Sequence, residues 1–160
     1  MFGVCLAFRS QAEWIGASMY KKILVPVDLA EESSWQIALP VAVRFAQLLD
    51  GSILVTTVVR HAQAYWEAAY LPFAFEELIT RTEQKLSTIV SSEVPSDVSV
   101  STKVGHGSIC REILHIARDE KVNLILMTAH RPGIRDYLIG PNAAHVVHYA
   151  DCSVLTVRGE

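Results

Sequence analysis

The residues with the clearest chemical potential lie between an apolar run, Leu124–Met127, and a short helical pattern that ends near Ala150. This segment contains, in order, His130, Arg131, Pro132, Gly133, Gly140, Pro141 and Asn142. A glycine-bearing loop between a strand and a helix aims backbone N–H groups and the positive end of the helix dipole at one point, which suits a phosphate. An ordinary strand-to-helix connection has the same order of residues, so both interpretations remain open on this pattern alone.

Asp28 is a second candidate, because it follows the apolar run Lys22–Val27. In an open parallel sheet, ligands bind beyond the carboxyl ends of the strands, near the point where the strand order reverses. If the strand order is 3-2-1-4-5, the first and fourth strands flank that point, and Asp28 converges with the loop after Met127. Asp28 either caps the following helix or accepts a hydrogen bond from a base or a ribose, and the convergence favours the second role.

Other kinds of site are not indicated. His145 and His148 are three residues apart on a predicted helix, but no cysteine or carboxylate at metal-ligand spacing accompanies them. The three cysteines are scattered and form no CxxC, which argues against a disulfide framework or a zinc site and fits a reducing cytoplasm. Neither GxSxG nor HExxH occurs, and no paired carboxylates suggest acid–base work. We therefore predict no catalytic residue and no metal ligand.

Length and composition indicate one folded domain. The chain has 160 residues, of which 51% are hydrophobic and 19% charged, and its net charge is −3. Such a chain buries a core without disulfides, and its small negative charge gives no reason to expect a nucleic-acid partner. No apolar run reaches the roughly 20 residues that span a bilayer, so we expect no membrane partner. We assign the domain to residues 19–160 and predict that residues 1–18 are an extension outside the fold, because Met19 opens the first strand-like run.

The elements that position these residues alternate along the chain. Five short apolar runs read as strands, at Lys22–Asp28, Ser52–Val59, Val98–Val104, Val122–Met127 and Ser153–Val157. Four segments between them have apolar residues at helical spacing, within 31–49, 78–89, 108–117 and after Gly140. This order predicts an α/β fold with an open five-stranded parallel sheet covered on both faces. The alternation in Val98–Val104 predicts an edge strand. Gly105–Gly107 are predicted to form a turn, and Ser108 is predicted to be the N-cap of the next helix.

Aromatic side chains crowd the connection at residues 60–75, which contains Tyr65, Trp66, Tyr70, Phe73 and Phe75. The segment is either a lid or partner surface, or a loop packed on the body of the domain. We favour packing.

Several runs together resemble one known family, the universal stress proteins. They are Ile23–Asp28, Val55–Val58, Leu126–His130, Leu138–Gly140, Val146–Val147 and Ala150–Val157. The resemblance covers residues 20–158. It implies a flavodoxin-like or adenine-nucleotide α-hydrolase-like fold with strand order 3-2-1-4-5 and, in one branch, ATP binding.

The loop after the fourth strand departs from the pattern of the ATP-binding branch, G-x2-G-x9-G-[ST]. Its first two glycine positions fall on Thr128 and Arg131, the spacing to Gly140 is one residue shorter, and Pro141 replaces the hydroxyl residue. The His-Arg-Pro version with Gly140-Pro-Asn142 resembles a subgroup that is similar to nucleotide binders. Asn142 supplies a polar contact and Arg131 a cation for phosphate.

The resemblance implies a site for ATP or another adenine nucleotide, with or without Mg²⁺. Carried over position by position, it places Pro26, Val27 and Asp28 near adenine and ribose, Val58 against the base, Met127 and Thr128 under base and ribose, and His130, Arg131, Gly140, Pro141 and Asn142 near the phosphates. It also implies a homodimer through the last strand, Val154–Val157, because a bare apolar edge strand invites pairing with a second copy.

Three functions are compatible with these residues. The first is a cytoplasmic stress-response protein that binds an adenine nucleotide and acts as a nucleotide-dependent regulator through a downstream protein partner. The second is a homodimeric interaction module that has lost nucleotide binding. The third, a slow ATPase or autokinase, ranks last because Asp28 is the one evident carboxylate for a base or Mg²⁺.

Overall fold

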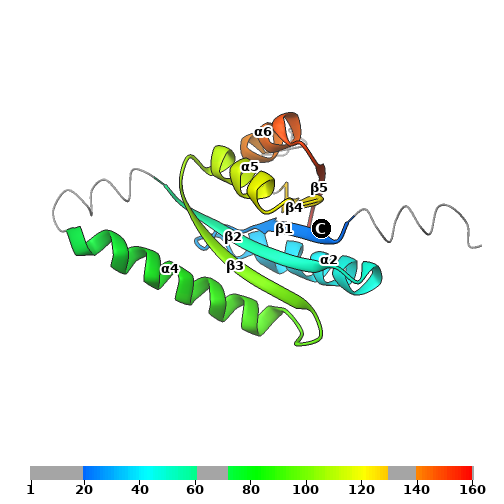
Figure 1. The fold of residues 1–160 in the computed structure, drawn as a ribbon, viewed down its shortest axis with the longest axis horizontal. Coiled ribbons are helices and arrows are strands. Elements are labelled where there is room, and N and C mark those ends of the chain that lie inside the picture. Colours follow the sequence, from blue (N-terminus) through cyan, green and yellow to red (C-terminus); the bar gives the residue numbers. More distant parts are fainter. Residues whose placement is uncertain (1–19, 61–71, 130–139, 160) are drawn as a thin grey trace, which may run out of the picture.

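The computed structural model describes residues 20–60, 72–129 and 140–159. The elements in order are β1 (Lys22–Pro26), α2 (Ser33–Leu49), β2 (Ser52–Arg60), α4 (Pro72–Glu93), β3 (Ser99–Gly107), α5 (Ile109–Asp119), β4 (Leu124–Thr128), α6 (Pro141–Tyr149) and β5 (Ser153–Val157) (Figure 1). The predicted extension at 1–18, most of the aromatic segment, and both His130 and Arg131 lie outside the described residues.

The five strands form one parallel sheet with the order β3-β2-β1-β4-β5. Parallel neighbours need a crossover, and each one among the described residues includes a helix (Figure 1). The predicted α/β class and the strand order 3-2-1-4-5 are confirmed.

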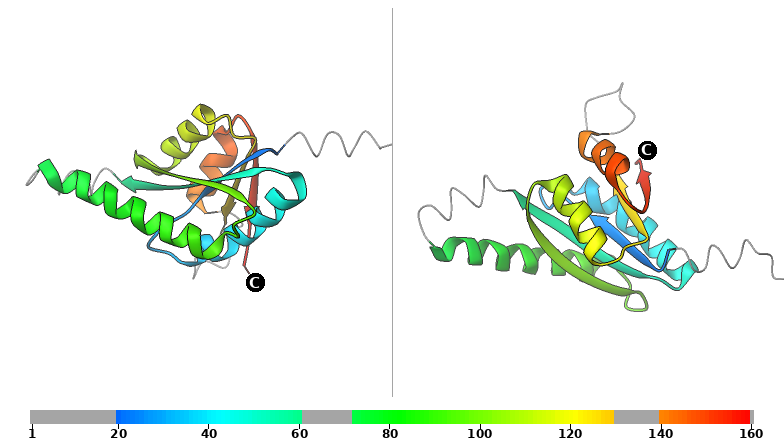
Figure 2. Two further views of the ribbon diagram at one scale, coloured as in Figure 1. Left: turned by 60° about the horizontal axis from the view of Figure 1, so that its bottom comes forward. Right: turned by 45° about the horizontal axis from the view of Figure 1, so that its top comes forward.

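Helices cover both faces of the sheet. Helices α2 and α4 lie on one face, and α5 and α6 lie on the other (Figure 2). Side chains of β1 alternate between them, so Ile23 and Val25 join the cluster under α2 while Leu24 joins the cluster under α5 and α6. All three are 0% exposed, which is why this strand reads as a continuous apolar run rather than an alternating one.

Strand β3 is the edge strand that its alternation predicts, but it is longer than predicted. It pairs with β2 over nine residues, from Ser52↔Ser99 to Arg60↔Gly107. The prediction of a turn at Gly105–Gly107 is wrong, because these residues continue the ladder. Gly105 faces α5 so closely that a Cβ there would lie 2.4 Å from Cγ of Glu112, and Gly107 has a φ of 129°, which favours glycine. Ser108 then takes the predicted N-cap position of α5.

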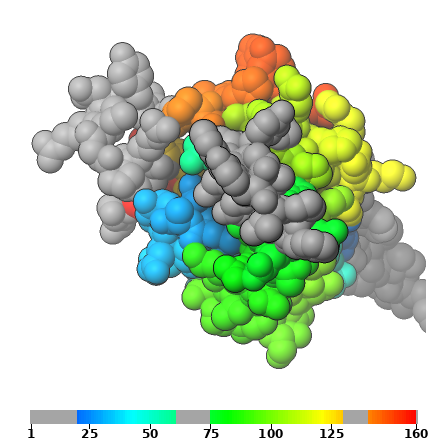
Figure 3. All heavy atoms as spheres, turned by 90° about the vertical axis from the view of Figure 1, so that its left-hand side faces the viewer, coloured from blue at the N-terminus to red at the C-terminus, as the bar shows by residue number. Residues whose placement is uncertain are grey.

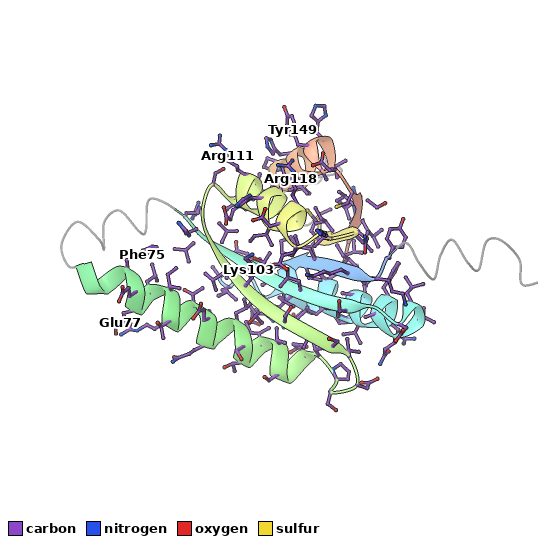
Figure 4. The ribbon with its side chains drawn as sticks, viewed as in Figure 1. Phe75, Glu77, Lys103, Arg111, Arg118 and Tyr149 are labelled. Carbon is purple, nitrogen blue, oxygen red and sulfur yellow. The ribbon has the colours of Figure 1, made fainter. Side chains whose placement is uncertain are left out.

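Phe75 is the one aromatic residue of the 60–75 segment whose side chain the structure describes. Phe75 in α4 is half-buried and meets the His106 ring of β3 edge-on, with 6.0 Å between the ring centroids (Figure 4). Phe75 belongs to helix α4, and the loop residues Tyr65, Trp66 and Tyr70 lie outside the described residues, so packing of the loop stays a prediction.

Charged side chains of β1 and β3 contact the end of α5. Glu120 accepts hydrogen bonds from Nζ of Lys22 in β1 at 2.8 Å and from Nζ of Lys103 in β3 at 2.9 Å (Figure 4). These two lysines lower the pKa of Glu120 from the usual 4.5 to about 2. One carboxylate thus joins two strands and a helix.

This contact predicts a specific pH dependence of stability. Because the pKa of Glu120 is lower in the folded chain, its contribution is complete above pH 4.5 and is lost as the pH falls toward 2. We expect the unfolding free energy of Glu120→Gln to fall less between pH 5 and pH 2 than that of the wild type, measured by urea unfolding at each pH. Glu93→Gln, at an exposed position in α4, is the control, and its free energy of unfolding should fall with pH as that of the wild type does. An equal fall in the free energy of unfolding for the wild type and Glu120→Gln would contradict the prediction.

Candidate functional site

The carboxyl ends of β1 and β4 flank the point where the strand order reverses. After β1 the chain builds outward through β2 to β3, and it then returns to place β4 on the other side of β1. In open α/β sheets this reversal leaves room for a ligand, because the connections from the two strands leave in opposite directions.

The ladder between these two strands also ends early. β1 pairs with β4 at two positions, Ile23↔Leu124 and Leu24↔Ile125. By contrast, β1 pairs with β2 as far as Pro26, and β4 pairs with β5 as far as Thr128. The last residues of β1 therefore pair with β2, and those of β4 pair with β5, but they do not pair with each other.

Three of the predicted base-contacting residues share a face of the sheet at this end. Val58 and Met127 belong to the cluster under α5 and α6, and Pro26 follows the same alternation as Leu24. Val27 differs, because its side chain is 6% exposed and lies in the cluster under α2, on the opposite face. Only the backbone of Val27 is therefore available to a ligand on the α5 side.

Asp28 organises the connection from β1 to α2. Its carboxylate Oδ1 accepts the N–H of Ala30 at 3.0 Å, which closes an Asx turn. The buried Ser34 hydroxyl accepts the N–H of Asp28 at 2.9 Å and donates to its carbonyl at 3.1 Å. The N-cap of α2 is Glu32, so Asp28 is not the cap. Sequence reasoning did not identify Ser34, which fixes the backbone of this candidate residue.

Helix α6 begins at the same end of the sheet with features that suit an anion. Gly140 is the N-cap and, as a glycine, has no side chain with which to cap the helix, and Pro141 is the first helical residue. The first N–H groups of a helix lack acceptors within the helix, and at this end of α6 they belong to Asn142 and Ala143. Gly140 has a φ of −64°, which any residue adopts, and a Cβ built there meets nothing within 4 Å among the described residues.

A contact with the neighbouring helix fixes Asn142. Sγ of Cys110, in the first turn of α5, lies 3.4 Å from Oδ1 of Asn142 and 3.9 Å from its carbonyl oxygen. Burial raises the pKa of the Cys110 thiol. Nothing in the sequence pattern marks Cys110 as part of a site, since it lies 32 residues before Asn142.

The histidines considered as metal ligands lie on α6 and contact an aromatic ring. His145 and His148 have ring centroids 4.5 Å and 4.6 Å from that of Tyr149. Within residues 20–60, 72–129 and 140–159, no three side chains of His, Cys, Asp or Glu form a group that could hold a metal ion.

A separate groove lies between α4 and β3. It is lined by Glu83, Gln84, Ser87 and Thr88 of α4 and by Thr102, Lys103 and Val104 of β3. None of the predicted site residues lines it. The candidate site is the carboxyl end of the sheet, and α2 (blue), α4 (green) and α6 (orange) are visible on the face of the molecule that Figure 3 shows.

The fold and this end of the sheet define a class of protein, an open α/β domain in which a helix with a glycine N-cap starts at the end of the sheet where the strand order reverses, a position that suits an anionic group. The model of the universal stress protein family matches residues 19–158. The chain belongs to the universal stress protein family.

Individual relatives agree with this assignment. Universal stress protein G of Shigella flexneri is 31% identical over 147 residues, which cover 88% of this chain and all of that protein. The solved structure of the hypothetical protein MJ0577 has a TM-score of 0.72 and 26% identity, and the match covers 89% of this chain and 98% of that one. A universal stress protein solved in complex with cAMP has a TM-score of 0.58 and 18% identity, covering 89% and 100% of the two chains, and it shows likeness of fold.

Among the described residues, no helix is both long enough and apolar enough to cross a membrane.

Proposed function

We propose that this stress protein binds ATP or a related adenine nucleotide at the carboxyl end of its sheet and acts as a nucleotide-dependent regulator in the cytoplasm. The fold supplies the position, because ligands of open α/β sheets bind at the reversal of strand order. A fold relative was solved with cAMP, an adenine nucleotide, although the two chains share only 18% identity. The half-buried Cys110 and Cys152 are free thiols, which fits a reducing compartment.

The observation that carries the proposal is Gly140. Its backbone has ordinary angles and its Cβ position is open, so neither conformation nor packing among the described residues requires glycine. A ligand close to the start of α6 would require it, because a side chain there would occupy the space of a phosphate beside the free N–H groups.

The other candidate residues take roles that follow from their positions. On the α5 face of the sheet, the half-buried Pro26 and Val58 offer an apolar surface for adenine, with the buried Met127 in the same cluster as Val58. Asp28 is exposed and its backbone is held by Ser34, which suits contact with ribose. Thr128 ends β4, and Pro141 and Asn142 begin α6. His130 and Arg131, between these elements, remain predicted phosphate contacts, and Mg²⁺ would be held by the phosphates with Asp28 as the nearby carboxylate.

Bound nucleotide can be sought directly. The purified protein is denatured, and the small molecules that it releases are identified by mass spectrometry. We expect an adenine nucleotide in the wild-type sample and a strongly reduced amount in Gly140→Val purified in parallel. Absence from both samples, followed by failure of added ATP, ADP and AMP to bind, would overturn the proposal in favour of an interaction module without nucleotide.

A second copy of the chain is the partner that we propose for β5. All its residues after Ser153 are half-buried, although β5 is the edge of the sheet beside β4. Apolar edge strands invite pairing, and a two-fold antiparallel contact of β5 with its copy would cover both edges.

The outward backbone groups of β5 give a matched test of this dimer. The carbonyl of Val157 points toward β4, where it accepts the N–H of Ala129 at 2.9 Å. Because backbone groups alternate along a strand, the N–H of Thr156 points outward and that of Leu155 toward β4. We expect Thr156→Pro to sediment as a monomer with little loss of thermal stability, whereas Leu155→Pro loses stability as well. A wild type that is monomeric at micromolar concentration would show the dimer to be wrong.

A further inference from the structure

The starts of α5 and α6 lie next to each other on the same face of the sheet (Figures 1 and 2). Cys110 is in the first turn of α5, and Asn142 is in the first turn of α6. Their side chains meet, with Sγ 3.4 Å from Oδ1 of Asn142, and the same sulfur lies 3.9 Å from the Asn142 carbonyl oxygen.

The chemistry of a thiol fixes the direction of this contact. A protonated thiol donates its hydrogen, and both of its partners here are oxygens. Burial raises the pKa of Cys110, so the thiol keeps its proton at neutral pH. With Oδ1 occupied as the acceptor, the carboxamide of Asn142 has its other end, the Nδ2 amino group with two N–H donors, turned away from Cys110.

We propose that Cys110 is a positioning residue that holds the Asn142 carboxamide with its amino group toward the ligand, so that the start of α6 presents donors only. The inference rests on the proposed nucleotide function and names the part of the nucleotide involved, the anionic phosphate chain. A free carboxamide would rotate and present its oxygen for part of the time, which repels a phosphate.

The position of Asn142 makes this orientation relevant to an anion. As the second residue of α6, Asn142 also offers its own backbone N–H, and Gly140 leaves the adjacent space open. Backbone donors, side-chain donors and the positive end of the helix dipole would then all interact with one phosphate group. Asn142 is exposed, so its amino group reaches solvent or ligand rather than the core.

Nucleotide titrations distinguish this role from a structural one. We expect Cys110→Ala to weaken ATP binding about two- to tenfold, which corresponds to the loss of one hydrogen bond. The affinity for adenosine should not change, because adenosine lacks phosphates. Cys110→Ser retains a hydrogen-bond donor, so its affinity for ATP should be closer to that of the wild type than the affinity of Cys110→Ala is. In an Asn142→Ala background, Cys110→Ala should have no further effect. Equal weakening of ATP and adenosine, equal loss in Cys110→Ser and Cys110→Ala, or a full cysteine effect without Asn142 would each overturn the proposal.

A measurement without nucleotide tests the orientation separately. The side-chain amide signal of Asn142 in a ¹⁵N–¹H NMR spectrum is assigned by its absence in Asn142→Ala. We expect this group to be ordered in the wild type and Cys110→Ser and mobile in Cys110→Ala, with the backbone signals of α6 unchanged. An amide with the same order in all three proteins would refute the role of Cys110. If the wild type binds no nucleotide while Cys110 still orders Asn142, the proposed function fails and the positioning contact stands.

Discussion

Gly140→Val should abolish ATP binding while leaving the fold intact. In the protein itself a Cβ at this position meets no described atom within 4 Å, and φ is −64°, so we expect the substitution to cost little folding free energy. In the complex it would stand between the ligand and the free N–H groups at the start of α6. We expect affinity to fall by at least about 100-fold, or ~2.7 kcal/mol, in calorimetric titrations.

A second valine on the same helix controls for added bulk. Ala144→Val introduces the same side chain one turn later, at an exposed position of α6. We expect it to keep ATP affinity within about twofold and to lose a few tenths of a kcal/mol of stability through lower helix propensity. Circular dichroism spectra of both variants should overlay that of the wild type. If Gly140→Val binds ATP as the wild type does, Gly140 is an ordinary turn residue and the phosphate site is misplaced.

The largest loss of stability among simple truncations is expected in α2. Leu39 is 0% exposed and belongs to the cluster between α2 and the sheet, which also contains Val25 and Leu126. Leu39→Ala removes buried methyl groups and leaves a cavity, which costs about 2–5 kcal/mol in well-packed cores. We expect this decrease in the free energy of unfolding, measured with urea.

Leu48 provides the matched comparison, because it is the same residue type on the same helix and is 82% exposed. Leu48→Ala should change the free energy of unfolding by less than about 0.5 kcal/mol. Similar values for the two variants would show that α2 does not pack on the sheet as the structure describes.

The sequence predicts the fold well where burial controls the pattern. The apolar run at Ile23–Val25 predicts a strand buried on both faces, and the structure confirms it. Gly105 and Gly107 led to the wrong prediction because glycine marks both turns and close approaches of backbone. Here Gly105 makes room for α5 inside a strand, and only the distance to Glu112 reveals that reason.

The candidate site is less accessible to sequence reasoning. Spacing places Asp28 and Gly140 at the same end of the sheet, because parallel strands share a direction. It cannot identify Ser34 or Cys110, whose importance comes from contacts across a turn and between two helices. It also does not show that Val27 could meet a ligand on the α5 side only through its backbone, because alternation turns the Val27 side chain to the opposite face.

Calorimetric titration of the wild-type protein with ATP, and with adenosine for comparison, tests the central claim most directly. We predict saturable binding of one nucleotide per chain, with ATP bound more tightly than adenosine because the start of α6 contributes through the phosphates. No heat of binding from ATP, ADP or AMP at millimolar concentration would contradict the claim, and so would equal affinity for ATP and adenosine.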